Sequence, residues 1–244
     1  MITFLKACNN NKATTVFDNF IIATKEFGLP SRIRCDHGVE NVDVCVYMEG
    51  VRGTNRGSAI KGKSSHNQRI ERLWVDVWDN LSNEFYDLFL YMEIEHLLDL
   101  TNPKHVFALH FIFLPRINQR LSSFIFQYNN HPLSTEHNRT PNQLFIQGIL
   151  QNNTCNVSVQ EIVHKAGNSL ETVDEIEEYG IEQNEDDHDE SAESLNETER
   201  PEHQIQENLL RQLRQEIDPL LESSATVYGV QLFQKVLAFL QRNN

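Results

Sequence analysis

The sequence predicts an α/β fold followed by a disordered acidic segment and two C-terminal helices. Three observations predict it. In residues 1–150, short runs that alternate apolar and polar residues, typical of strands, lie among runs with the apolar spacing of helices. Residues 151–202 are polar and acidic, and residues 203–244 regain helical periodicity. These three ranges are the domains that we predict.

The first fifty residues predict strand, helix, strand and helix. The opening strand rests on apolar residues that alternate from Ile2, and the first helix ends at Gly28 and Pro30. In the second strand, Ile33 and Cys35 alternate with arginines. The ranges are 1–8, 12–27, 31–36 and 39–50.

The next predicted element is a loop over residues 51–65, which contains three glycines. Ser64 or Ser65 can cap the helix that follows, whose apolar residues keep helical spacing over 70–92. On this spacing, Trp74 and Trp78 are expected to pack in the core rather than to form an exposed stacking platform.

Four more helices complete the prediction. One covers 104–129 and is interrupted near Pro115, and one covers 140–150, with Thr140 as its cap. Two amphipathic helices follow in 203–244, separated by Pro219. Because short helices of this kind need a surface on which to bury their apolar residues, we expect a homo-oligomer or a helical protein partner there.

The net charge of −14 does not argue against nucleic acid, because it is concentrated in one tract. Residues 171–202 hold 15 of the 35 acidic residues and a single basic one, Arg200, so the rest of the chain is balanced. The tract is typical of a solubilising spacer, and repulsion or mimicry of DNA is the alternative. In contrast, residues 52–72 carry six basic residues against Glu71, which favours contact with a DNA backbone over a merely solvated loop.

Several classes of protein are excluded. The four cysteines form no CxxC pair and the histidines show no zinc-ligand spacing, so neither a disulfide framework nor a zinc site is expected. No apolar run approaches the roughly 20 residues of a membrane helix. Without a secretory leader in this sequence, we expect a nuclear or cytoplasmic protein.

Two carboxylates are the candidate catalytic and metal-binding residues. Asp36 follows a strand, where α/β proteins place ligands, and Glu71 lies in the first turns of the long helix. Carboxylate oxygens suit Mg²⁺, and nearby bases suit the phosphates of a nucleic acid. The simpler alternatives are a turn residue for Asp36 and a carboxylate favoured by the helix dipole for Glu71.

Two segments around these carboxylates resemble motifs of retroviral-type integrases and related transposases. Residues 28–41, GLPSRIRCDHGVEN, resemble the family segment GLPxxxxxDxGxEN, and residues 64–74, SSHNQRIERLW, resemble SxxNxxxERxW. Residues 124–145, which contain NNHPLSTEHNRTPNQLF, are similar to the end of the family's core. The likeness covers residues 1–150 and is greatest to integrase-core proteins derived from mobile elements in animal genomes.

The resemblance implies a ribonuclease-H-like core with a mixed sheet, and Mg²⁺ as the ancestral cofactor. It makes Asp36 the second metal-binding aspartate and Glu71 the catalytic glutamate. It also implies DNA contacts near these carboxylates, and the expected DNA-binding residues are Arg56, Lys61, Lys63, Asn67, Arg69 and Arg72.

The sequence departs from the family at its start. The family's first aspartate lies on a strand ahead of the one that residues 2–8 resemble, and Asp18 cannot replace it because it falls within a helix. We therefore expect a core that lacks its first strands and is impaired in Mg²⁺-dependent strand transfer on DNA, with a loss on the order of 10³-fold or more. The alternative is a non-enzymatic module that binds DNA or protein.

Overall fold

The computed structural model describes residues 1–53, 56–62, 68–151, 207–221 and 228–243. They fall into two compact units, each with its own apolar core. The first unit comprises Met1–Leu5, Asn10–Val75 and Ile125–Asp187, and the second comprises Lys6–Asn9, Asp76–Phe124 and His188–Asn244. The predicted acidic linker lies, except for Gln151, outside the described residues.

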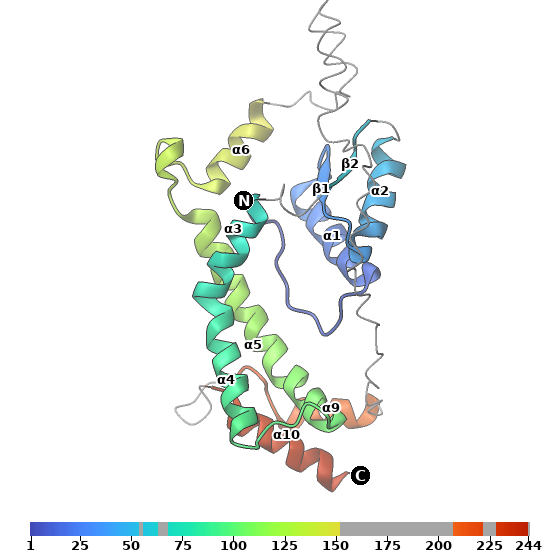
Figure 1. The fold of residues 1–244 in the computed structure, drawn as a ribbon, viewed down its shortest axis with the longest axis vertical. Helices are drawn as coiled ribbons and strands as arrows, with labels where there is room; N and C mark the ends of the chain where they lie inside the picture. The colour runs from blue at the N-terminus through green and yellow to red at the C-terminus, as the bar shows by residue number, and fades with distance from the viewer. Residues whose placement is uncertain (54–55, 63–67, 152–206, 222–227, 244) are drawn as a thin grey trace, which may run out of the picture. The chain divides into compact units, whose positions relative to one another are not determined.

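The first unit contains a small parallel sheet with two helices beside it (Figure 1). In the sheet, Ile33 pairs with Ala59 and Cys35 pairs with Lys61. Phe20, Val44 and Met48 form the buried core, in which the ring of Tyr47 meets those of two phenylalanines edge-on. The elements are α1 (Ala13–Phe27), β1 (Ile33–Cys35), the 3₁₀ turn η1 (Val39–Asn41), α2 (Val42–Arg52) and β2 (Ala59–Lys61).

Two predictions for this unit were wrong. The strand β2 lies in the range predicted as a loop, because its three residues carry too little pattern and are ordered by pairing with the distant β1. The strand predicted over residues 1–8 does not form. Asparagine side chains of α5 (Pro103–Asn130) bind this segment instead: Asn129 receives a hydrogen bond from the Ile2 amide (2.7 Å) and donates one to the Ile2 carbonyl (2.8 Å).

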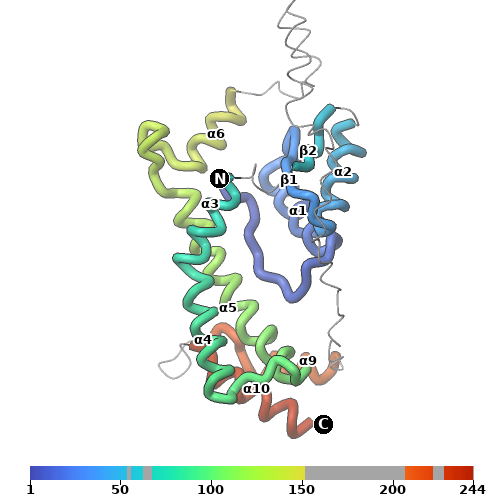
Figure 2. The backbone as a smooth tube through the Cα atoms, in the orientation of Figure 1, coloured from blue at the N-terminus to red at the C-terminus, as the bar shows by residue number. Residues whose placement is uncertain are grey.

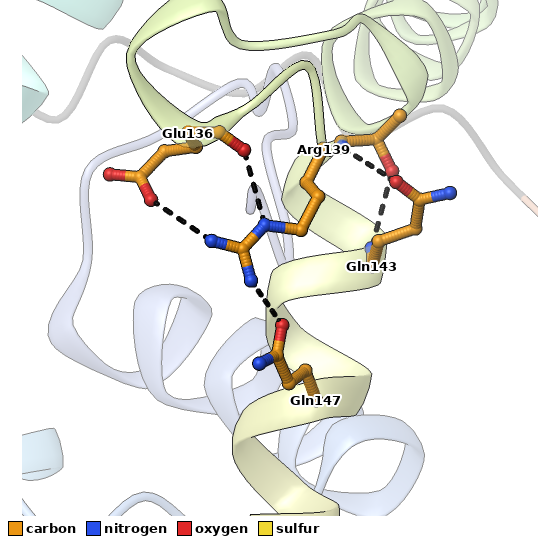
Figure 3. Close-up of polar contacts among 5 residues, drawn as sticks. Glu136, Arg139, Gln143 and Gln147 are labelled. Atoms are coloured by element: carbon orange, nitrogen blue, oxygen red, sulfur yellow. Dashed lines mark hydrogen bonds and ion pairs between the residues drawn. The ribbon is translucent and has the colours of Figure 1, made fainter.

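The turn between α5 and α6 (Pro141–Gln151) fixes where α6 begins (Figure 3). The Arg139 guanidinium donates to the Glu136 carbonyl (3.1 Å) and to the Gln147 amide oxygen. The backbone N–H of Gln143 donates to the Thr140 hydroxyl (3.2 Å), and the side-chain oxygen of Gln143 accepts from the backbone N–H of Thr140 (2.9 Å). This reciprocal cap confirms the predicted start of the helix.

The long predicted helix over 70–92 is divided in the structure. A π-helical turn, η3 (Trp78–Ser82), separates α3 (Gln68–Val77) from α4 (Asn83–Ile94), and the predicted caps Ser64 and Ser65 lie outside the described residues. The burial predicted for the tryptophans was wrong: Trp74 is 52% exposed and Trp78 is 47% exposed. Val77 and Leu81, on the neighbouring face, are buried instead.

Helix α5 is continuous through Pro115, contrary to the predicted interruption. Proline removes one backbone hydrogen bond, but Ile112 and Phe113, just before it, are almost fully buried in the core of the second unit. Burial of this face outweighs the local cost of the proline.

The same core contains the two C-terminal helices, α9 (Glu207–Glu216) and α10 (Val230–Arg242). Figure 2 shows α10 beside the connected ends of α4 and α5. Leu213, Phe233 and Val236 are fully buried there, and the buried Arg116 donates to the Leu221 carbonyl (2.9 Å). The chain's own helices thus bury these apolar faces, while an oligomer or a helical partner stays a prediction.

The described part of the chain is mostly helical, with the two-stranded sheet as its β component. None of its helices is long and apolar enough to cross a membrane.

Candidate functional site

The two predicted catalytic residues line one cavity of the first unit. This cavity has a volume of about 1060 Å³, and residues of α1, β1, the turn after β1, α3 and α6 surround it. We call it the carboxylate cavity. Its charged lining residues are Arg32, Arg34, Asp36, Glu40, Arg69 and Glu71.

Asp36 is oriented by the turn that follows β1. It is half-buried, and its Oδ1 accepts hydrogen bonds from the Gly38 amide (3.2 Å) and from Nδ2 of Asn41 (2.8 Å). No other described group donates to the carboxylate. Its second oxygen, Oδ2, is therefore available to a ligand at the carboxyl end of the strand, where such sites form in α/β proteins.

Glu71 lies in the first turn of α3 and is exposed. The fold brings it to the same cavity as Asp36, although 34 residues separate the two in sequence. Each of the two motifs thus contributes one carboxylate to the lining of the same cavity. The catalytic roles of the two residues stay predictions.

The donor set for a metal is incomplete in the described residues. Glu40 also lines the cavity, but no group of three histidine, cysteine, aspartate or glutamate side chains comes together there or elsewhere in the described parts of the chain. Two carboxylates bind Mg²⁺ mainly with the help of water and substrate phosphates. The described side chains alone therefore do not build a closed site for this metal.

The predicted DNA-binding residues are placed differently from one another. Arg69 is exposed and lines the cavity, and Lys61 ends β2 opposite Cys35, next to Asp36. Arg56 is not a lining residue, and its guanidinium donates to the Arg52 carbonyl (3.3 Å) and the Ser31 hydroxyl (3.5 Å). Arg72 is exposed but is not a lining residue, and Lys63 and Asn67 lie outside the described residues.

Sequence reasoning missed two arginines of the site. Arg32 and Arg34 are exposed and line the cavity together with Asp36. The alternation along an extended chain places every second side chain on the same face, and this signal could have identified them from the sequence. They give the cavity a basic wall on the sheet side, while Arg69 supplies a positive charge from α3.

Cys35, directly before Asp36, has a perturbed thiol. Burial and a hydrogen bond with Cys45, whose Sγ lies 3.4 Å away, raise the pKa of Cys35 from 9.0 to about 12. The nearby Asp36 carboxylate acts in the same direction, and Lys61 opposes it. The thiol is therefore neutral at physiological pH.

This shift predicts a loss of stability in alkali. The unfolded thiol ionises near pH 9 and the folded thiol near pH 12, so the contribution of Cys35 to stability is present below pH 9 and declines above it. We expect the free energy of unfolding in urea to fall more steeply between pH 9 and 10.5 for the wild type than for Cys35→Ala. Parallel pH profiles for the two proteins would contradict the shift.

Comparison with known proteins gives a single result. A family model described as "Integrase core domain" matches residues 1–159. The search of curated proteins and the search of solved structures each found no match.

Proposed function

Because the chain belongs to the integrase core domain family, we propose that it binds DNA at the carboxylate cavity and that its ancestral strand-transfer reaction is impaired. Membership of the family supports a general integrase-type function involving nucleic acid. The observation that carries the more specific proposal is that Asp36 and Glu71 line one cavity together with Arg32, Arg34 and Arg69. An origin in a mobile element, which the motifs indicate, belongs to the same proposal.

The arrangement suits a phosphodiester. The exposed arginines can bind phosphate oxygens by paired hydrogen bonds, since their guanidinium groups are planar and carry several donors. DNA bound in this way has its backbone beside the two carboxylates. Divalent metal, when bound with DNA, would supply charge stabilisation to the phosphate, and Asp36 and Glu71 would hold it.

The proposal that catalysis is impaired rests on the side chains that are available to bind a metal at the cavity. The resemblance to retroviral-type integrases implies three metal-binding acidic residues. Asp36, Glu40 and Glu71 all line the cavity, but no group of three metal-ligating side chains comes together among the described residues. Binding of DNA by the arginines needs no metal. The two functions can therefore be tested separately.

DNA binding is tested by its dependence on salt. For the double variant Arg34→Gln/Arg69→Gln we expect the slope of log K against log salt to become shallower by about 2, because each phosphate contact contributes about 1. The measurement is fluorescence anisotropy of a labelled DNA duplex over a series of salt concentrations without metal.

Two variants serve as controls. Arg120→Gln removes one positive charge, from an exposed arginine that pairs with Glu84 and does not line the cavity, so its slope is expected to stay near that of the wild type. Arg56→Gln neutralises a predicted DNA-binding residue that does not line the cavity, and we expect little change in slope. If the double variant kept the wild-type slope, the cavity would not be the DNA site.

A further inference from the structure

Trp74 is a large apolar side chain that lies exposed at the cavity instead of being buried in the core. It is 52% exposed and lines the carboxylate cavity. It follows Glu71 by three positions on α3, and residues at this spacing are neighbours on a helix surface. No described aromatic ring packs against the indole, and its exposed part borders the cavity, where a ligand can reach it.

The cavity around Trp74 can accept a nucleotide. Its volume of about 1060 Å³ is slightly above that of ordinary ligand pockets, which range from roughly 300 to 1000 Å³, so a nucleotide has room in it. Phe145 and Ile149 of α6 add apolar lining, while Arg34 and Arg69 add positive charge. An aromatic ring together with cationic groups is the combination that binds the bases and phosphates of single-stranded nucleic acid.

We propose that Trp74 is a stacking platform for an unpaired base at a DNA end. The base lies against the indole, and the adjoining phosphates contact Arg34 and Arg69 beside Asp36 and Glu71. The inference rests on the proposed DNA-binding function and adds the residue that would hold an unpaired base at the cavity, Trp74. An unpaired base is required because the bases inside a duplex are covered on both faces by their neighbours.

The second tryptophan provides a matched control. Trp78 is similarly exposed, at 47%, but its ring packs against Tyr86 with 5.7 Å between centroids, and it does not line the cavity. The chain has two tryptophans in all, so each single variant leaves one fluorescent indole. Trp78→Phe therefore reports on Trp74, and Trp74→Phe reports on Trp78.

The experiment compares two DNA duplexes of the same paired sequence, one blunt and one with a short unpaired thymidine extension. Titration of Trp78→Phe with the extended duplex is expected to quench the fluorescence of Trp74 through stacking, and blunt duplex is expected to quench it less. Trp74→Phe should show little quenching with either. By anisotropy, the full chain should prefer the extended duplex, and Trp74→Ala should lose about 5- to 150-fold in affinity for it while keeping its affinity for blunt duplex.

The outcomes distinguish this inference from the function on which it rests. If both duplexes bind with equal affinity and Trp74 is not quenched, DNA binding stands and the stacking role is overturned. If no variant and no wild-type protein binds either duplex, both proposals fail. Circular dichroism of each variant establishes that it is folded, which is expected because both indoles are about half exposed.

Discussion

Strand transfer by this chain, assayed with Mg²⁺ or Mn²⁺, is expected to be about 10³-fold or more below that of a core with three metal-binding acids. Phosphoryl transfer depends on metal ions that neutralise charge on the attacked phosphate. Asp36, Glu40 and Glu71 line the cavity, but the described residues bring no three metal-ligating side chains together. The measurement is the joining of a labelled DNA end to a target duplex. We expect the product to be at background level.

Glu71→Gln is the informative variant for this assay. It replaces the carboxylate with a neutral group of similar shape, so residual catalysis that depends on the metal should disappear. If the wild type joins DNA detectably and Glu71→Gln does not, the proposed impairment is wrong. DNA binding measured on the same protein shows that a negative result reflects chemistry rather than an unfolded sample.

Phe233→Ala is expected to destabilise the second unit by about 3–5 kcal/mol, the usual cost of removing a fully buried phenylalanine. Phe233 lies on α10 with none of its surface exposed, and its ring meets that of His105 edge-on, with centroids 5.9 Å apart. Its loss leaves a cavity among the helices α4, α5, α9 and α10. The free energy of unfolding in urea measures the effect.

The same substitution at Phe126 is the control. Phe126 lies on α5 and is 70% exposed, so Phe126→Ala should change the free energy of unfolding by less than about 0.5 kcal/mol. Equal stability of the two variants would show that α10 does not pack on the chain's own helices. In that case the predicted external partner for residues 203–244 would be favoured.

Local sequence signals were sufficient to predict most helices and to identify some residues of the candidate site. The end of α1 at Gly28 and the reciprocal cap of α6 depend on residues only a few positions apart, so they can be predicted from the sequence. The motif residues Asp36 and Glu71 were identified in the same way, and the structure places both at one cavity. Arg69 was also predicted for the site and lines it.

The remaining features depend on contacts between distant residues. Residues 1–8 alternate like a strand, yet Asn118 and Asn129 bind the backbone of this segment with their side-chain amides. Arg56 lies in the basic segment, but it does not line the cavity and its guanidinium donates to the Arg52 carbonyl and the Ser31 hydroxyl, which the sequence does not indicate.

The sequence by itself therefore determined the family and the positions of most helices, and it predicted the two acidic residues of the candidate site, because motifs, caps and periodicity are local properties of the chain. The tertiary structure alone decided which helix faces are buried, that Trp74 faces the cavity and that the C-terminal helices pack against α4 and α5. The physical reason is that burial depends on which surfaces meet, and an amphipathic or aromatic stretch does not specify its neighbour.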